Sequence, residues 1–573
     1  MKIIIVGGVA CGPKAAARLH RLRPHADITI IEKGELLSYA GCGMPYYISG
    51  EVHNINELMK TNLGIVRDSH YFRNFKGLNV RNLTLATRID RQKKQLEILD
   101  LQSITREMIP YDKLILATGG QPIMPPIPGI DLKGVHSLHD LHSARKIKDA
   151  IRDGAKKAVI IGGGAIGIEV ADAFIKNDVE TTIIEAKNRL FAKVLDPDMS
   201  ATVQDYLAVD DIILQLSTRV IGFEGNEEGG LKKVITDRGI VDADLVINAI
   251  GVHPNTLLAE DAGLELGVTG AIRVNAHMQT TDPDIYAGGD CVESIHLITR
   301  QPVYIPMGDT ANKHGRVIAN HIAEFYPSNS FPGVLGTAIY KYGDLSIGHS
   351  GVTHTMATSL GYDCESILYP GLDKPEFFPT ARRIDMKLVA DRKNHRIIGV
   401  QIVGEGEVSK RLDVLATAMT FGATVEQLAH LDLGYAPPYS PAIDNAINAA
   451  NICCNKLNDV SRSVTPAQVW QMRQNGSKLL LVDVRTQREY QSQRIDLEDV
   501  VHIPLNLLRQ RMAELPRDRP VITFCKVGLR GYEACQLLRG LGLDNACFME
   551  GGVALWPYPK ITGQPEQPNL STQ

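Results

Sequence analysis

The sequence lacks a CxxC pair, a long apolar run and a strong excess of either charge, and each absence argues against a class of protein. Its nine cysteines are scattered and odd in number, which is typical of reduced cytoplasmic thiols and not of a disulfide framework or a metal site. No apolar run reaches the roughly 18 residues that a membrane-spanning helix needs. A net charge of -4 gives no reason to expect a nucleic-acid or acidic-membrane partner.

The length and composition indicate a soluble protein of several domains. The 573 residues are too many for one domain, and 44% hydrophobic with 22% charged residues is ordinary for a globular protein. The apolar run at the start of the chain, residues 3–6, ends at Gly7, so we interpret it as a buried strand and not as part of a signal peptide. We therefore expect a cytoplasmic protein.

A first nucleotide-binding pattern opens the chain. A β-branched run ends in GGVACG, residues 7–12, and a helix of small residues follows. Gly7 permits the turn and Gly12 lets helix and strand pack closely, so the helix N-terminus faces a pyrophosphate. Val9 replaces the middle glycine of the usual fingerprint. The next predicted strand ends in Glu32, about 25 residues after Gly7, where a carboxylate binds ribose hydroxyls.

A second, complete pattern lies further along the chain. A predicted strand runs into GGGAIG, which contains Gly162, Gly164 and Gly167, and the following strand ends in Glu185. A carboxylate at that position accepts from both ribose hydroxyls and repels a 2′-phosphate, which favours NADH. Basic residues shortly after it leave NADPH possible. Two such patterns predict two dinucleotides, and the economical pair is a flavin and a nicotinamide.

Two further segments resemble parts of flavoproteins that bind two dinucleotides. Thr118 and Gly119 follow a predicted strand in an Ala-Thr-Gly turn. The segment TTDPDIYAGGDC, residues 280–291, contains Asp290, which in this pattern sits at a helix N-terminus and holds the ribityl chain of FAD. Taken together, residues 1 to about 450 resemble the pyridine nucleotide–disulfide oxidoreductases.

The stretch SYAGCG, residues 38–43, contains a single cysteine, Cys42, and is similar to the coenzyme A–disulfide reductase branch of that family. Glutathione-reductase-like members instead carry two cysteines four residues apart. The resemblance implies that hydride passes from NADH to FAD and electrons then reach Cys42, which holds half of the substrate as a mixed disulfide or holds sulfur as a persulfide. A helix N-terminus or positive charge would favour its thiolate. The alternative is a buried structural cysteine.

Four residues are candidates for binding coenzyme A. Ser38, one helical turn before Cys42, could hydrogen-bond the pantetheine arm. Arg18, Lys60 and Arg67 could bind the phosphates. The alternative for these three is an ordinary surface cation.

Residues 326–450 alternate predicted strands with a helix, and the resemblance implies that they form a homodimer. The loop YAPPYS, residues 435–440, then reaches the partner's cysteine, and Tyr435 donates a proton or hydrogen bond to the leaving thiolate. Alternatively Tyr435 only packs against prolines. Members that reduce coenzyme A disulfide carry a second tyrosine where this chain has Phe377 and Phe378, which favours a smaller sulfur substrate.

A separate module follows at about residue 463. Its predicted strand ends at Cys525, and the loop KVGLRG leads into a helix that begins near Arg530. Loop amides and the helix dipole would stabilise Cys525 as thiolate or persulfide. With Asp483 and Arg485, this segment resembles a single rhodanese domain. A phosphatase loop is similar, but no matching general acid is present.

We therefore predict an α/β protein with two Rossmann-like dinucleotide-binding domains (FAD and NAD), an α+β dimerisation domain and a C-terminal α/β rhodanese domain. The predicted boundaries are 1–120 with 251–325 for FAD, 121–250 for NAD(P)H, 326–450 for dimerisation, 451–463 for a linker, 464–562 for the rhodanese domain and 563–573 for a tail.

The predicted function is an NADH-dependent persulfide or polysulfide reductase, with FAD, NADH and coenzyme A as cofactors, small sulfur compounds as substrates and no metal. Three alternatives stay open. They are a coenzyme A–disulfide reductase, an NADH oxidase or peroxidase in which Cys42 cycles through sulfenic acid, and a sulfurtransferase whose flavin part is a sensor or scaffold.

Overall fold

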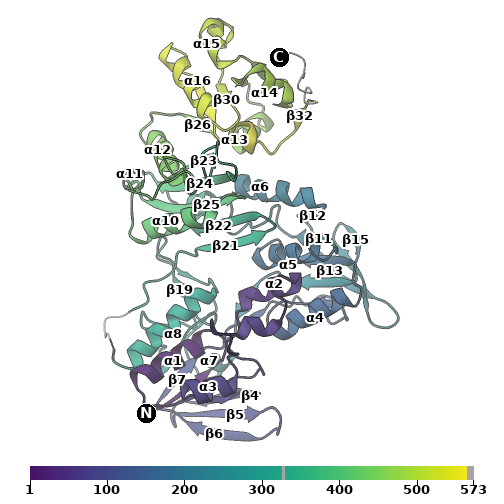
Figure 1. Ribbon diagram of the computed structural model, residues 1–573, viewed down its shortest axis with the longest axis vertical. Coiled ribbons are helices and arrows are strands. Elements are labelled where there is room, and N and C mark those ends of the chain that lie inside the picture. The colour runs from purple at the N-terminus through teal and green to yellow at the C-terminus, as the bar shows by residue number, and fades with distance from the viewer. Residues whose placement is uncertain (326–329, 564–573) are drawn as a thin grey trace. The chain divides into compact units, whose positions relative to one another are not determined.

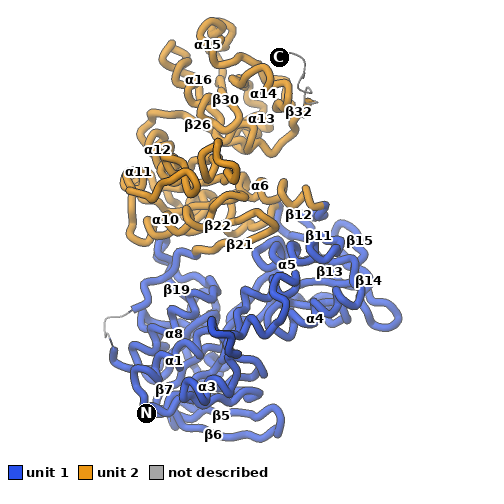
Figure 2. Tube along the Cα trace, in the orientation of Figure 1, with its two compact units in different colours: residues 1–188, 211–336 blue, residues 189–210, 337–573 orange. Residues whose placement is uncertain are grey.

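The computed structural model describes residues 1–325 and 330–563. Contacts divide the chain into two compact units, which Figure 2 colours separately: residues 1–188 with 211–336, and residues 189–210 with 337–573. The predicted tail, apart from its first residue, and the predicted start of the dimerisation domain lie outside the described residues. The six-part division stays a prediction, but the segment 189–210, which falls in the predicted NAD(P)H domain, belongs to the second unit.

The first unit opens with a five-stranded sheet of order β18-β7-β1-β2-β3, in which every paired strand is parallel. Its central strand is the β-branched run at the start of the chain, and its residues 3–5 are buried. Helices α1 and α8 lie side by side (Figure 1) and pack on the sheet through small and aliphatic residues. The bounds are β1 Lys2–Val6, β2 Asp27–Ile31, β3 Asn79–Arg81, β7 Lys113–Leu116, β18 Ile285–Ala287, α1 Cys11–Leu22 and α8 Gly308–Ile322.

A second parallel sheet repeats this pattern within the same unit, in the order β12-β11-β10-β16-β9. Three-stranded antiparallel sheets, β4-β5-β6 and β13-β14-β15, accompany the two parallel sheets. The bounds are β4 Thr84–Asp90, β5 Gln95–Asp100, β6 Arg106–Pro110, β9 Val135–His136, β10 Lys157–Ile161, β11 Glu180–Glu185, β12 Ile213–Leu216, β13 Val220–Gly225, β14 Leu231–Thr236, β15 Gly239–Asp242 and β16 Leu245–Asn248.

The second unit contains an antiparallel sheet of order β21-β22-β25-β24-β23. Its central strands are almost wholly buried because α10 covers β22 and β25, and α12 packs on β23 and β24. Lys387 on β24 binds Asp198 of α6, Nζ to Oδ2 at 2.7 Å, which ties the 189–210 segment to this sheet. The bounds are α6 Pro197–Leu207, β21 Ala338–Tyr342, β22 Leu345–Gly351, β23 Cys364–Leu372, β24 Arg383–Asp391, β25 Ile397–Gly404, α10 Val408–Thr420 and α12 Asn445–Leu457.

The C-terminal part of the second unit is a parallel sheet of order β26-β31-β30-β27-β29. It is anchored beside the antiparallel sheet by Glu550, which accepts from Lys456 Nζ at 2.8 Å and from the Leu368 N–H at 2.9 Å. The bounds are β26 Ser463–Val464, β27 Leu480–Asp483, β29 Val500–His502, β30 Val521–Phe524, β31 Ala546–Met549, α13 Pro466–Gln474, α14 Gln487–Ser492, α15 Leu505–Arg511 and α16 Leu529–Gly540.

The predicted fold class is confirmed. The chain has two Rossmann-like sheets, an α+β domain and a C-terminal α/β domain. Within the described residues, no helix is long and apolar enough to cross a bilayer. The remaining helices used below are α2 Met44–Ser49, α4 Leu141–Arg152 and α5 Ala165–Ile175.

Candidate functional site

The two glycine turns have the same geometry. A Cβ on Gly12 would lie 2.0 Å from the Gly7 carbonyl oxygen, and one on Gly167 would lie 2.2 Å from that of Gly162. Helix and strand can approach this closely only because a side chain is absent. Around Gly164, a Cβ would meet no atom within 4 Å. That open space is where the backbone of the turn can approach a dinucleotide.

The two predicted carboxylates are held in matching positions at these turns. Glu32 accepts from the Gly8 N–H at 2.6 Å and the Gly34 N–H at 2.7 Å. Glu185 accepts from the Gly163 N–H and the Lys187 N–H, both at 2.7 Å. Each carboxylate is therefore fixed beside its turn with lone pairs left for ribose hydroxyls. The donor set fits one dinucleotide at each turn.

The remaining predicted cofactor residues lie in the first unit, and one expectation is wrong. Thr118 donates to the Asn255 carbonyl at 2.6 Å, and Gly119 takes φ +73 with open space around its Cα. Asp290 does not sit at a helix N-terminus. It follows Gly289, at φ +82, in a turn, and the next helix, α8, begins only at Gly308. Burial raises the pKa of Asp290.

Cys42 lies in a short 3-10 turn, Gly41–Gly43, which runs directly into α2. It is exposed, whereas Cys11 and Cys291 of the same unit are buried. Ser38 is not one helical turn before it. Ser38 is a buried residue at φ +47 whose N–H donates to the Gly8 carbonyl at 2.8 Å. It therefore links the thiol segment to the first glycine turn.

The charged groups that act on Cys42 are carboxylates and not cations, while α2 begins two residues after it, at Met44. The pKa of Cys42 is raised by partial desolvation of its sulfur and by the carboxylates of Glu169, Asp290 and Asp309, while a backbone hydrogen bond lowers it. Glu169 belongs to α5, against which α2 packs, and burial raises its pKa to about 7. No local pattern in the sequence points to Glu169, because only the packing of the two helices places it near the thiol.

The three candidate phosphate-binding cations differ in their surroundings. Arg18 donates to Asn320 Oδ1 at 3.0 Å and lies over the Phe325 ring, so it joins α1 to α8. Lys60 pairs with Glu57, and Arg67 donates to the Met59 carbonyl at 2.9 Å. Lys60 and Arg67 lie at the base of one small hairpin, since Lys60 pairs with Val66 in a β-bridge. This hairpin adjoins the thiol segment, because the Ala40 N–H donates to the Leu58 carbonyl at 2.8 Å.

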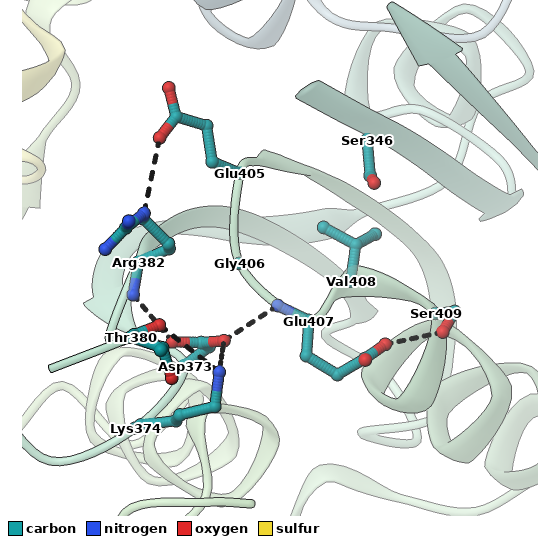
Figure 3. Close-up of a pocket in the computed structure, with 10 residues that line it drawn as sticks. All are labelled: Ser346, Asp373, Lys374, Thr380, Arg382, Glu405, Gly406, Glu407, Val408 and Ser409. Atoms are coloured by element: carbon teal, nitrogen blue, oxygen red, sulfur yellow. Dashed lines mark hydrogen bonds and ion pairs between the residues drawn. The ribbon is translucent and has the colours of Figure 1, made fainter. Parts of the chain in front are cut away.

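In the second unit, Tyr435 is 55% exposed and Phe377 is 77% exposed. Phe377 lies in the loop between β23 and β24. A pocket of about 490 Å³ lies at the base of this loop, and Figure 3 shows its lining. The Asp373 carboxylate there accepts from the Arg382 and Glu407 N–H groups at 2.8 and 3.0 Å. Lys374 pairs with Asp373 and Arg382 pairs with Glu405, so we interpret this pocket as a brace for the loop.

Cys525 lies at the end of β30, with 1% of its surface exposed. The Gly528 N–H points at its sulfur, N to Sγ 3.1 Å, as expected for a loop that cradles an anion. The loop is backed by Gly552, where a Cβ would lie 2.2 Å from the Cys525 carbonyl oxygen. Arg485 is buried and pairs with Asp483 at 2.6 Å, which identifies these two residues as part of the framework.

Arg530 is the second residue of α16, and its guanidinium interacts with both Glu489 and the Cys525 side chain. It forms two hydrogen bonds with Glu489, at 2.7 and 2.8 Å. This pairing lowers the pKa of Glu489 to about 2 and raises that of Arg530. The pairing of Glu489 with Arg530 was not predicted from the sequence. Thr486 followed three residues later by Glu489 is a capping-box pattern, and it is formed at the start of α14.

Comparison with known proteins agrees with this arrangement. Residues 1–304 match the model of the pyridine nucleotide-disulphide oxidoreductases, residues 337–447 match the dimerisation domain of that family, and residues 465–557 match the rhodanese-like domain. The chain therefore belongs to the pyridine nucleotide-disulphide oxidoreductase family and carries a C-terminal rhodanese-like domain. It is an enzyme, and FAD and NAD(P)H are its cofactors.

Three similar proteins cover most of the chain. An NAD(P)H sulfur oxidoreductase (CoA-dependent) of Pyrococcus furiosus is 36% identical over 79% of this chain and 98% of its own length. The structure of an NAD-dependent persulfide reductase from A. fulgidus is 40% identical, with a TM-score of 0.92 over 97% of this chain and 100% of that chain. The reduced CoADR-RHD of Bacillus anthracis is 33% identical, with a TM-score of 0.90 over 97% of both chains.

Proposed function

We propose that this protein is an NADH-dependent reductase of persulfide or polysulfide sulfur, which it takes from coenzyme A persulfide or a similar small compound and releases as sulfide. The observation that carries the proposal is the state of Cys42. It is an exposed thiol in the FAD-binding unit, and the other described cysteines of that unit are buried. A lone accessible sulfur can form a disulfide only with a substrate.

The reaction balances with NADH as the reductant. One coenzyme A persulfide, one NADH and one proton give coenzyme A, hydrogen sulfide and NAD⁺. The Cys42 thiolate attacks the inner sulfur of the persulfide, a mixed disulfide forms and hydrosulfide leaves. Two electrons and a proton then break the mixed disulfide to the Cys42 thiolate and coenzyme A. Bound FAD supplies the two-electron relay between the NADH hydride and the sulfur–sulfur bond.

The remaining roles follow from the residues described above. Glu32 and Glu185 would orient the riboses of FAD and NADH. Lys60 and Arg67 stand beside the Cys42 segment, where their charges could bind the phosphates of coenzyme A. Arg18 is the weaker candidate because it already joins α1 to α8. Ser38 acts through the backbone and holds the thiol segment against the first turn.

The protein acts as a homodimer in this proposal. Tyr435 of one protomer would donate a proton to the thiolate that leaves the partner's Cys42. Its exposure in the single chain leaves its hydroxyl available for that contact. Phe377 replaces the second tyrosine hydroxyl expected of an efficient disulfide reductase, which favours the smaller sulfur substrate over coenzyme A disulfide.

The rhodanese-like domain would carry sulfane sulfur on Cys525. The Gly528 amide and the start of α16 stabilise a persulfide anion there. Sulfur then passes between Cys525 and the carrier thiol that visits Cys42. The protein is expected to work in the cytoplasm, where the thiols stay reduced.

Rates of NADH oxidation with coenzyme A persulfide, coenzyme A disulfide and hydrogen peroxide, measured side by side without oxygen, test the proposal. The persulfide should react fastest and yield one sulfide per NADH. A faster reaction with the disulfide would assign the protein as a coenzyme A–disulfide reductase. A faster reaction with peroxide would assign it as a peroxidase, and oxygen consumption without sulfide release in a parallel aerated assay would assign it as an oxidase.

A further inference from the structure

Two loops of the dimerisation domain share one buried anchor. Arg411, on α10, is 1% exposed, and its guanidinium bonds to groups at the base of both the Tyr435–Ser440 loop and the Phe377 loop. We propose that Arg411 is a positioning residue that sets these two loops for the partner's Cys42. The inference rests on the proposed function, because that function gives the loops their role at the thiol.

The first arm leads to the Tyr435 loop. Arg411 Nη2 lies 2.9 Å from Asp444 Oδ2, and the same carboxylate oxygen accepts from Ser440 Oγ at 2.9 Å. Ser440 closes the loop, since its N–H donates to the Ala436 carbonyl at 3.1 Å. Asp444 also caps α12 by accepting from the Ala446 N–H at 3.0 Å. The end of the loop that carries Tyr435 is therefore fixed through Asp444.

The second arm leads to the Phe377 loop. Arg411 Nη2 also donates to the Asp373 carbonyl at 2.8 Å. Asp373 closes the base of that loop, because it bonds to Arg382 in both directions: its N–H donates to the Arg382 carbonyl at 2.9 Å and its carboxylate accepts from the Arg382 N–H at 2.8 Å. Figure 3 shows this carboxylate among Lys374, Arg382 and Glu407. Phe377 stands at the exposed end of the loop.

A buried guanidinium is a costly way to stabilise a fold. Removing its charge from water is unfavourable, and replacing a buried ion pair by apolar residues is often neutral or stabilising. Arg411 instead supplies directional hydrogen bonds, since two N–H groups of its planar fork, both on Nη2, meet the Asp444 and Asp373 acceptors at fixed angles. A lysine keeps the charge at this site but lacks the fork. Arg411→Lys therefore separates charge from geometry.

A double-mutant cycle on the dimeric holoenzyme tests the proposal, with coenzyme A persulfide as the probe and sulfide release as the readout. Tyr435→Phe should lower kcat about a hundredfold, the lower end of the range for a lost general acid. Arg411→Lys should lower kcat to a similar extent, and the double variant should be no slower than Tyr435→Phe alone. Reduction of the bound flavin by NADH under argon should be unchanged. The matched control is Arg392→Lys, because Arg392 is an exposed arginine of the same domain, directly after β24.

If the losses in kcat multiply in the double variant, or if Arg411→Lys slows flavin reduction as much as sulfide release, then Arg411 has a general structural role and the proposal is overturned. If Arg411→Lys does not fold, Ser440→Ala removes only the hydroxyl that reaches Asp444. It should slow sulfide release severalfold in the wild-type background and not at all in Tyr435→Phe. A wild-type enzyme that does not reduce the persulfide would instead refute the proposed function, before the cycle is measured.

Discussion

Glu489 holds the Arg530 guanidinium through two hydrogen bonds, at 2.7 and 2.8 Å, and the same guanidinium interacts with the Cys525 thiol. The pair orients the start of α16, whose loop amide points at that sulfur. Glu489→Gln should therefore slow transfer of sulfur from thiosulfate to cyanide by about tenfold, because charge-assisted bidentate pairs are the more strongly oriented ones. Glu514→Gln, in an exposed pair of the same domain, is the control and should leave the rate unchanged.

The same pair predicts a pH dependence of stability. The pKa of Glu489 is lowered from 4.5 to about 2 in the folded chain, so its contribution to stability is complete above pH 4.5 and is lost as the pH falls towards 2. The urea concentration that half-unfolds the rhodanese-like domain, measured by tryptophan fluorescence, should fall steeply as the pH is lowered from 4.5 to about 2 in the wild type. In Glu489→Gln, the same midpoint should fall less steeply with pH. Equal slopes would show that the pair does not persist in solution.

Cys42 should become more reactive when the nearest carboxylates are neutralised. Glu169 raises the pKa of this thiol and is itself charged above a pKa of about 7. In Glu169→Gln, the pH at which iodoacetamide labels Cys42 half-maximally should move down, with peptide mapping to identify the labelled residue. Glu180→Gln, at the exposed start of β11, is the control. An upward shift would mean that Glu169 does not face the thiol.

Nucleotide preference should depend on Glu185. The carboxylate is fixed beside the second glycine turn by two N–H groups, and it disfavours a 2′-phosphate. The wild type should use NADH with a kcat/KM about tenfold or more above that for NADPH, and Glu185→Ala should narrow this ratio while the FAD content stays the same. Glu180→Ala should keep the wild-type ratio. A wild type that prefers NADPH would contradict the assignment.

The rhodanese-like domain should tumble with the dimerisation domain. Trp470 and Trp556 are the only two tryptophans of the sequence. Both lie in the rhodanese-like domain, so tryptophan fluorescence reports on the motion of that domain. Lys456 binds Glu550 at 2.8 Å and Glu365 at 3.0 Å. Lys456→Met therefore leaves the buried carboxylate of Glu550 without its cation, while Glu365 keeps its pairing with Arg392. Tryptophan anisotropy should then gain a fast component that is absent in the wild type and in the exposed control Lys393→Met. Identical decays would show that this contact does not fix the domain.

The fold was predictable because local patterns carry it. Strand, glycine turn and distal acid lie within about 30 residues of one another in both nucleotide-binding halves, and the spacing of Gly7, Gly12 and Glu32 needs no long-range information. The rhodanese-like domain was recognised in the same way, from the loop between Cys525 and Arg530. These are places where backbone geometry itself requires the residue type.

The predictions that were wrong concern features that depend on tertiary structure. The helix expected at Asp290 is absent because the chain continues through a turn towards β19, Ser294–Ile295, and no local signal distinguishes the two. The acidic surroundings of Cys42 arise where α2 packs on α5. The role of Arg411 could not be predicted from the sequence, because its partners Asp373 and Asp444 lie 38 residues before it and 33 residues after it in the chain.

The most direct test of the account is sulfide release by Cys42→Ser in the FAD-loaded enzyme, with NADH and coenzyme A persulfide and without oxygen. The account predicts that release falls to the background rate while NADH still reduces the bound flavin and Cys525 still accepts sulfur from thiosulfate. Sulfide release at the wild-type rate in this variant would contradict it.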